Sequence, residues 1–375
     1  MEIYYPLKKL PRKIDVGYLL ESLYYLSESI QQVFIEEGNI KVVTNIDNEQ
    51  EILTKLERLI DKHKTLRKLP KKIIKSNQSE STKSKKAFSF AEINNSGLLL
   101  KGDSVFLPDI FEKLFRNIAL KYSANLRKYP SLLSKEVISQ SGYMSHFPQN
   151  LYRVSEVKHT SEILENWNIN NDIESGDYFQ NNDFFMQPCV CYHVYNEVSK
   201  DSSNAKDCCE GDLVVYSAGG KCYRHEHQQR LSDIRLRDFN MHETVFIGQE
   251  DMVQKLRLSL IQDTWDLFEE LGFIGYIETA SDPFFIGNDN GKTMYQLAGD
   301  LKYELRIKLE NDIDFSLSSF NLCGDVLCKA FKINSQGKSS FSGCAAHGLD
   351  RWIQGFLYTF GADSNRWPKF VREMI

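Results

Sequence analysis

The sequence lacks the long apolar runs of a membrane protein. No stretch of its 375 residues approaches the roughly 20 consecutive apolar residues that a membrane-spanning helix needs. The N-terminal segment MEIYYPLKKLPRK also lacks the apolar core of a secretory signal. From these two absences we expect no membrane association and a cytoplasmic location.

Cysteine is scarce as well, with 8 residues in the chain. Domains that depend on disulfides are small and much richer in cysteine, and a reducing compartment keeps thiols free. The scarcity excludes a disulfide scaffold. It favours packing or metal binding as the use of the thiols.

Glycine-rich phosphate loops and a strong charge of one sign are also absent. No Walker-type or dinucleotide-type pattern occurs, and Gly219-Gly220 indicates only a turn. Side chains must therefore hold ATP if ATP binds. The net charge of -5 creates no field that attracts nucleic acid to the whole protein, so any basic partner surface must be local.

The chain does have the composition of a packed globular protein, with 42% hydrophobic residues, 23 Phe and 18 Tyr. Its length predicts about two domains. Residues 1–68 are expected to form a small α+β domain with a hairpin turn near Gly38-Asn39. Its two helices are predicted from apolar residues at helical spacing, namely Val16, Leu19, Leu20 and Leu23, and Ile52, Leu53, Leu56, Leu59 and Ile60.

Residues 69–90 are rich in Lys and Ser and are predicted to be a solvated linker. This linker is either a simple tether or a basic segment that attracts an acidic partner. Residues 91–375 are predicted to be an α+β domain built on an antiparallel sheet. The predicted helices are DIFEKLFRNIALKYSANL and DMVQKLRLSLIQDTWDLFEELG. The β-rich runs are FFMQPCVCYHVYNEV, DLVVYSAGGKCYRHEH, NMHETVFIG, KYELRIKLE and DFSLSSFNLCGDVLCKAFKI.

Two segments of the larger domain carry candidate phosphate-binding arginines. Arg224 and Glu226 follow a predicted strand, and Phe239 begins the next strand after a basic loop. This arrangement resembles motif 2 of class II aminoacyl-tRNA synthetases, which implies that Arg224 binds the α-phosphate while Glu226 and Phe239 hold the adenine. Near the C-terminus, GCAAHGLDRWIQGFLYTFG is similar to motif 3 and implies that Arg351 binds the far phosphates. Taken alone, an Arg-x-Glu triplet is more commonly a surface ion pair than a site. The alternative for Arg351 is an ordinary helix-surface residue. Motif 1 is not identified.

A finer resemblance extends from about residue 97 to the C-terminus. It points to the amino acid:[carrier protein] ligases and the related zinc-dependent methanogen-type seryl-tRNA synthetases. The matching segments, in chain order, are GYMSHFPQNL, CYHVYN, CYRHEHQQRLSDIRLRDFNMHETVFIG, SDPFF, LKYEL, SSFN and GCAAHGLDR. The resemblance implies the class II antiparallel fold, ATP and Mg²⁺ as cofactors, and a homodimer.

The same resemblance implies a Zn²⁺ site formed by Cys191, Glu243 and Cys344. Three protein ligands leave one position open, as in catalytic zinc sites, and the amino group of an amino acid can take it. Cys189 is the main rival ligand, and a buried cysteine is more commonly a small core residue. Four histidines near these positions are expected to be structural: His193, His225, His242 and His347.

Glu304 and Asn321 match positions that lie near the ATP phosphates, their magnesium ions or the substrate in this class. An ordinary cross-strand contact is the alternative for both. The sequence departs from its relatives at His227, where Pro is usual, and at Asp350, where Glu is usual. These departures leave the phosphate-binding and metal-binding positions intact.

We therefore expect an enzyme that activates a small amino acid, glycine or alanine, as an aminoacyl adenylate. The acceptor is expected to be the phosphopantetheine thiol of an acidic carrier protein, because a thiol needs no general base. tRNA is not expected, since the long heptad-patterned arm of seryl-tRNA synthetases is missing. An atypical seryl-type synthetase and a non-catalytic sensor or regulator are the alternatives.

Overall fold

The computed structural model describes residues 1–12, 14, 16–45, 48–63, 71–78, 92–94, 97–165, 178–200, 213–280, 300–310, 313–335 and 338–375. In these ranges no helix combines the length and the apolar character that crossing a membrane requires. The expected matching segment SDPFF and two of the cysteines, Cys208 and Cys209, lie outside the described residues.

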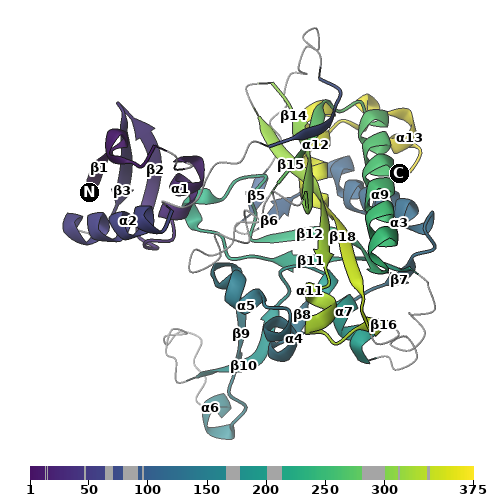
Figure 1. Ribbon diagram of the computed structural model, residues 1–375, viewed down its shortest axis with the longest axis horizontal. Helices are drawn as coiled ribbons and strands as arrows, with labels where there is room; N and C mark the ends of the chain where they lie inside the picture. The colour runs from purple at the N-terminus through teal and green to yellow at the C-terminus, as the bar shows by residue number, and fades with distance from the viewer. Residues whose placement is uncertain are drawn as a thin grey trace.

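The N-terminal unit is a three-stranded antiparallel sheet in the order β1-β3-β2, with two helices (Figure 1). Its elements are β1 (Glu2–Pro6), α1 (Val16–Leu23), β2 (Ile30–Glu36), β3 (Asn39–Thr44) and α2 (Glu49–His63). The β2–β3 hairpin turns at Glu37 and Gly38, which both have positive φ. The two predicted helices and the hairpin between them are confirmed. The apolar faces of both helices lie buried against the sheet.

The rest of the chain is built on an eight-stranded sheet in the order β4-β13-β14-β15-β18-β12-β11-β7. Every neighbouring pair is antiparallel except β7 and β11. The strands are β4 (Ile73–Ser76), β7 (Asn125–Arg127), β11 (Val214–Tyr223), β12 (Asp238–Gly248), β13 (Gly275–Thr279), β14 (Lys302–Lys308), β15 (Asp314–Gly324) and β18 (Phe341–Gly348).

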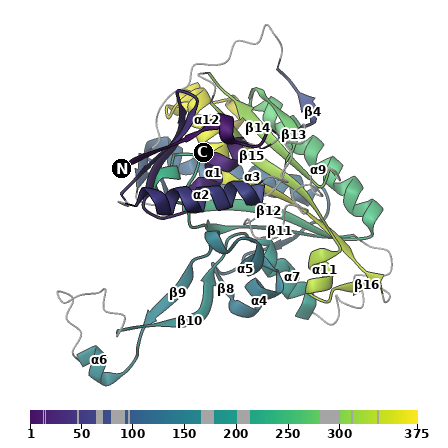
Figure 2. The ribbon, with the colours of Figure 1, turned by 60° about the vertical axis from the view of Figure 1, so that its left-hand side comes forward.

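Helices cover both faces of this sheet and define two separate cores. One face packs against α3 (Leu107–Leu120), α9 (Glu250–Glu270) and α12 (Leu349–Phe360). The other face packs against α4 (Lys135–Gln140), α5 (Tyr143–His146), α7 (Cys191–Lys200) and α11 (Val326–Ala330). The expected α+β class with a mainly antiparallel sheet and flanking helices is thus confirmed (Figures 1 and 2).

Smaller elements complete the described chain. A second three-stranded sheet, ordered β8-β10-β9, reaches away from the body and leads to α6 (Figure 2). The bounds of the remaining elements are β5 (Glu92–Asn94), β6 (Gly97–Leu99), β8 (Leu132–Ser134), β9 (Arg153–Val157), α6 (Ser161–Glu165), β10 (Phe179–Met186), the 3₁₀ turn η4 (Gln228–Arg230), β16 (Asn334–Ser335), β17 (Lys338–Ser339) and α13 (Lys369–Arg372).

Three local predictions were wrong. The run CYHVYNEV was expected to be β-rich but forms α7, whose buried Val194, Tyr195 and Val198 recur at helical spacing. Part of the expected linker forms β4, which pairs with β13 at the edge of the large sheet. The Gly219-Gly220 pair lies inside β11 and not in a turn.

The glycines in β11 are explained by close packing on both faces of the sheet. A Cβ atom on Gly219 would lie 2.9 Å from the carboxyl group of Glu112 on α3. A Cβ atom on Gly220 would lie 3.2 Å from the side chain of Gln187 on the opposite face. The two glycines therefore allow neighbouring side chains to approach the strand closely, and they do not reverse the chain.

Candidate active site

A cavity of about 380 Å³ lies on the sheet face that also packs against α5 and α7. Strands β12, β14, β15 and β18, the loop after β11 and the start of α12 contribute its walls. The structure brings all nine residues singled out in the sequence to this cavity: Cys191, Arg224, Glu226, Phe239, Glu243, Glu304, Asn321, Cys344 and Arg351.

Strand register explains why residues far apart in the chain meet here. Glu304, Ser319, Ala346 and Glu243 form one row of directly opposed residues across four strands. Lys302, Asn321 and Cys344 form a second row, two residues away on each strand. Because residues two apart point to the same face of a strand, both rows face the cavity.

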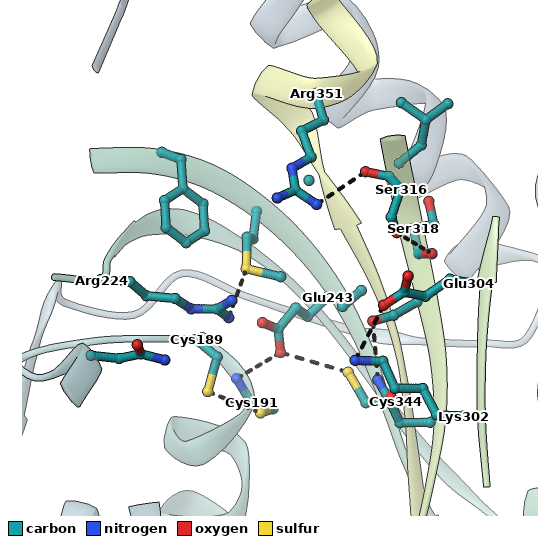
Figure 3. Close-up of a pocket in the computed structure, with 18 of the residues that line it drawn as sticks. Cys189, Cys191, Arg224, Glu243, Lys302, Glu304, Ser316, Ser318, Cys344 and Arg351 are labelled. Carbon is teal, nitrogen blue, oxygen red and sulfur yellow. Dashed lines mark hydrogen bonds and ion pairs between the residues drawn. The ribbon is translucent and has the colours of Figure 1, made fainter. Parts of the chain in front are cut away.

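Sulfur and carboxylate donors gather at one end of the cavity (Figure 3). The Sγ atoms of Cys189 and Cys191 are 3.5 Å apart, and the ligand atoms of both cysteines and of Glu243 lie within 4.8 Å of one another. The Sγ atom of Cys344 is 3.6 Å from Oε2 of Glu243. We call these four residues the thiol–carboxylate cluster.

The backbone before α7 fixes the carboxylate of this cluster. Glu243 is only 2% exposed and accepts hydrogen bonds from the backbone N–H groups of Val190, at 3.1 Å, and Cys191, at 2.9 Å. A buried carboxylate in such a position presents its remaining lone pairs to the thiols. Burial raises the pKa of the Cys189 thiol well above its usual range, and Cys191 and Glu243 add to that rise.

This donor set fits a zinc ion. Thiolates and carboxylates are ordinary zinc ligands. Two thiolates on one tetrahedral ion stand about 3.8 Å apart when each Zn–S bond is about 2.3 Å. The spacing of Cys189 and Cys191 is close to this value. The ligand atoms that all lie within 4.8 Å of one another belong to Cys189, Cys191 and Glu243. Cys344, which the sequence resemblance implies as a ligand, lies beside Glu243 but is not part of that group, whereas Cys189, the rival ligand, is.

Arg224 occupies the wall between the cluster and the basic loop. Its Nε donates to the carbonyl of Pro188 at 3.0 Å, and its guanidinium lies 5.2 Å from the ring centroid of Phe239. Burial acts to lower the pKa of Arg224, but the charges of Tyr143, the neighbouring thiols and Glu243 raise it above the usual value. The guanidinium is therefore held in a fixed, charged state facing the cavity.

Arg351 enters the cavity from the first turn of α12 (Figure 3). Its Nε donates to the carbonyl of Ile234 at 2.9 Å, and its Nη1 donates to the carbonyl of Ser316 at 3.2 Å. Burial lowers the pKa of the guanidinium, but arginine remains charged at neutral pH. The preceding Asp350 accepts a hydrogen bond from the backbone N–H of Asn240, which ties α12 to β12.

Two acidic residues in the cavity are paired with cations. Glu304 lies 3.4 Å from Nζ of Lys302 and 3.5 Å from Nη1 of Arg306. Glu226 lies 3.5 Å from Nη1 of Arg235. Sequence reasoning missed Lys302, which is 9% exposed and lines the cavity. The sequence did contain a signal for Lys302, because it lies two residues before Glu304 and both side chains therefore point to the same face of the strand.

The histidines lie elsewhere in the structure. His242 and His347 oppose each other across β12 and β18 and point to the other face of the sheet, where Phe115 of α3 stacks on His347. His193 stacks on Tyr129, with ring centroids 5.0 Å apart. No histidine is found among the described residues that line the cavity.

Comparison with known proteins places the chain in a class. No family model matches the sequence. An amino acid–[acyl-carrier-protein] ligase from Bradyrhizobium diazoefficiens is 28% identical over 253 residues, covering 66% of this chain and 75% of that relative. A type-2 serine–tRNA ligase from Methanococcus aeolicus is 25% identical over 66% of this chain. The chain spans only 49% of that second relative.

Solved structures agree with the fold. The crystal structure of M. kandleri SerRS in complex with A. aeolicus tRNASec superposes with a TM-score of 0.70 and 17% identity, covering 100% of this chain and 77% of that one. Seryl-tRNA synthetase from Pyrococcus horikoshii complexed with ATP gives a TM-score of 0.55 at 13% identity, covering 74% of this chain and 56% of that one.

The protein therefore has the class II aminoacyl-tRNA synthetase-like fold. Within that class its sequence is similar both to amino acid–[acyl-carrier-protein] ligases and to type-2 serine–tRNA ligases, as the motifs indicated. Both groups of relatives are ligases, which supports the expected enzyme class.

Proposed function

We propose that the protein is an ATP-dependent, AMP-forming ligase that activates a small amino acid and transfers it to the phosphopantetheine thiol of a carrier protein. One observation carries this proposal. Two phosphate-binding arginine candidates, Arg224 and Arg351, line the same cavity as the thiol–carboxylate cluster. Such a cavity can hold ATP and an amino acid together, with their reacting groups close to each other.

In the first step, a carboxylate oxygen of the amino acid attacks the α-phosphorus of ATP. A new P–O bond forms, and the bond between that phosphorus and the bridging oxygen breaks to release pyrophosphate. Arg224 would offset the charge that builds on the α-phosphate, and Arg351 would bind the outer phosphates. Phe239 and Glu226 would hold the adenine by stacking and by hydrogen bonding.

Cys191, Glu243 and Cys344 would hold Zn²⁺, which when bound supplies a Lewis-acid position for the amino group of the substrate. A carboxylic acid without that amine would lose this contact. Tyr143 and Tyr192 line the same cavity and pack edge to face with centroids 5.9 Å apart. Their bulk favours a small side chain, and glycine or alanine is the proposed substrate.

Glu304 and Asn321 are proposed to contact Mg²⁺ or the phosphates. Lys302 and Arg306 now neutralise Glu304. A bound Mg²⁺–ATP complex would bring its own cation and compete with those ion pairs for Glu304.

We also propose that the protein is a homodimer in the cytoplasm.

The second candidate is a seryl-type aminoacyl-tRNA ligase, because a type-2 serine–tRNA ligase is 25% identical over 66% of this chain. A carrier protein remains the preferred acceptor. The amino acid–[acyl-carrier-protein] ligase is matched over 75% of its length, whereas the serine–tRNA ligase is matched over 49%. A thiol acceptor also needs no general base, since it is partly ionised at neutral pH.

The testing experiment is amino-acid-dependent exchange of pyrophosphate into ATP across all twenty amino acids, before and after removal of zinc. Exchange with a small amino acid that is lost on chelation and restored by zinc is expected. The labelled amino acid is then offered to a phosphopantetheinylated carrier protein, to its serine-to-alanine form and to tRNA. Labelling of the first alone supports the proposal, while labelling of tRNA alone favours the second candidate.

Absence of exchange from folded, zinc-loaded protein would contradict both ligase functions. It would leave the third possibility, a non-catalytic sensor or regulator. Binding of ATP and amino acid measured by calorimetry would then identify the ligand of such a sensor.

A further inference from the structure

Cys189 is the member of the thiol–carboxylate cluster to which the proposed three-ligand metal site gives no role. Its Sγ atom is 3.5 Å from that of Cys191, and its thiol and the carboxylate of Glu243 are within 4.8 Å of each other. This places it at ligand distance from two proposed metal ligands. Cys189 also lines the cavity.

The backbone around Cys189 is held on both sides. The carbonyl of Pro188 accepts from Arg224, and the N–H groups of Val190 and Cys191 donate to Glu243. Gln187 is fixed by its backbone N–H to Ser131 and by its side-chain amide to Lys221. The thiol is thus presented to the cluster by a segment that hydrogen bonds hold on both sides, as a preorganised ligand would be.

Arg224 provides the charge that a fourth anionic donor requires. A dication bound by three thiolates and one carboxylate carries two net negative charges. The guanidinium of Arg224, anchored on the carbonyl of Pro188 next to Cys189, faces this excess charge and reduces its cost. Arg224 therefore offsets part of the charge that a fourth anionic ligand would add.

We propose that Cys189 is a fourth protein ligand of the metal in the substrate-free enzyme and that the amino group of the substrate displaces it. This inference rests on the proposed function for the presence of a metal at the cluster. With a metal bound, the bond to Cys189 Sγ would break as the bond to the amine nitrogen formed. The proton of the substrate ammonium group would pass to the released sulfur of Cys189.

This exchange has two consequences. The resting site is closed by four protein ligands and retains its metal tightly, as structural sites do. Binding of the amino acid costs one metal–sulfur bond, so the site favours ligands with a free amine that can replace it. Cys189 would then set both metal retention and amine selectivity.

The test uses the full-length protein reconstituted with Co²⁺, whose sulfur-to-metal absorption reports the number of bound thiolates. Cys189→Ser is compared with the wild type and with Cys222→Ala, which removes a buried thiol of the same core that does not line the cavity. The wild type and Cys222→Ala are expected to show three thiolates, and Cys189→Ser two. Circular dichroism of each protein checks that it is folded.

Two further measurements complete the test. Addition of the amino acid without ATP should lower the intensity of the sulfur-to-metal absorption of the wild type to that of two bound thiolates. The absorption of Cys189→Ser should not change. Zinc competition with a chelator should show about tenfold or greater loss of affinity in Cys189→Ser and none in Cys222→Ala. If Cys189→Ser is unfolded, X-ray absorption of the wild-type zinc protein counts the sulfur neighbours directly.

The outcomes separate this inference from the proposed function. Two thiolates in the wild type, or the same spectrum and zinc affinity in Cys189→Ser, would overturn the role of Cys189 and leave the three-ligand proposal standing. A wild-type protein that binds neither Co²⁺ nor Zn²⁺ would overturn both proposals together.

Discussion

At the scale of single residues, the site depends on the shape of arginine side chains as well as on their charge. Arg224 and Arg351 each use part of the guanidinium to bond backbone carbonyls, of Pro188 in one case and of Ile234 and Ser316 in the other. These bonds aim the rest of the planar group at the cavity. A lysine has a single donor centre and cannot make both sets of contacts.

We predict that Arg224→Lys and Arg351→Lys each lower amino-acid-dependent pyrophosphate exchange by about a hundredfold. The reason is the loss of a preorganised donor to a phosphate whose charge changes in the transition state, typically about 3 kcal/mol. Arg366→Lys, an exposed position outside the cavity, is the matched control and should keep wild-type exchange. Full activity in either cavity variant would remove that arginine from the proposed mechanism.

Glu226 is predicted to give ATP binding a dependence on pH. Burial raises the pKa of this carboxyl above its ordinary 4.5, although Arg230, Arg224 and Arg351 oppose the rise. The charged form, which we propose accepts a hydrogen bond from the adenine amino group, is therefore lost at a higher pH than for an exposed glutamate. The KM for ATP should increase as the pH falls toward this raised value.

Glu226→Gln separates the charge from the shape. This variant should raise the KM for ATP several-fold at neutral pH, because a hydrogen bond to a charged acceptor is the stronger one. The KM of this variant for ATP should also no longer increase as the pH is lowered. A wild-type KM that stays constant down to pH 4.5 would contradict the role given to Glu226.

At the scale of elements, the contact between β12 and β18 contains two buried histidines that make stability depend on pH. His242 and His347 are opposed residues, 2% and 1% exposed, and they bond Ser217 and Ser318 at 2.8 Å each. Burial lowers the pKa of His242 to about 4, and burial together with His242 lowers the pKa of His347 well below its usual value. Both imidazoles are therefore neutral in the folded protein at neutral pH.

The lowered pKa of His242 in the folded protein determines how the free energy of unfolding depends on pH. Between the folded pKa of about 4 and the unfolded value of 6.5, the unfolded chain binds more protons at His242. Stability is complete above pH 6.5 and decreases as the pH falls toward 4, by up to about 3 kcal/mol for His242 alone. Urea unfolding between pH 7.5 and 5 measures this loss.

His242→Gln should weaken the pH dependence of the urea midpoint over that range, even if the variant is less stable overall. The exposed His159→Gln is the control and should keep the wild-type dependence. An identical dependence in both variants would show that another buried group, such as His193, dominates the acid transition.

The same elements show what the sequence could predict. Strand and helix positions around Arg224, Phe239 and Arg351 were predictable because each element has regular apolar spacing and the motifs have a fixed order. The helix α7 was missed, because the strand preference of its valines and aromatic residues outweighed the helical spacing of Val194, Tyr195 and Val198 in our prediction. Packing against β12 selects the helix. Membership of Cys189 in the cluster depends on the turn before α7, which spacing alone does not determine.

At the scale of the whole molecule, the N-terminal unit contacts the loop that is proposed to bind ATP. Arg230 of η4 bonds the carboxylate of Glu21 on α1 and donates to the hydroxyl of Tyr25 at 2.9 Å. Nη1 of Arg235 lies 3.4 Å from Glu21 and 3.5 Å from Glu226. Through Arg235, the N-terminal unit is thus linked to the residue proposed to hold the adenine.

A ring contact supports the same interface. Tyr24 and His227 lie with ring centroids 5.1 Å apart, and His227 is 5% exposed. His227 is one of the two positions at which the family resemblance led us to expect another residue, proline in this case. The imidazole of His227 makes a tilted aromatic contact with Tyr24, which the saturated pyrrolidine ring of proline would not make. We infer that the N-terminal unit orders the loop between β11 and β12.

Glu21→Ala is predicted to raise the KM for ATP by up to about fivefold while kcat changes little. The ion pairs that Glu21 makes are partly exposed and together are worth about 1 kcal/mol, which corresponds to that factor if their loss frees the loop. Limited proteolysis should show faster cleavage between β11 and β12 in the variant. Glu57→Ala, an exposed position on α2, is the matched control. If Glu21→Ala keeps both the wild-type KM and the wild-type cleavage rate, the contact joins the two units without ordering the ATP site, and a function for the N-terminal unit must be sought on its other surfaces.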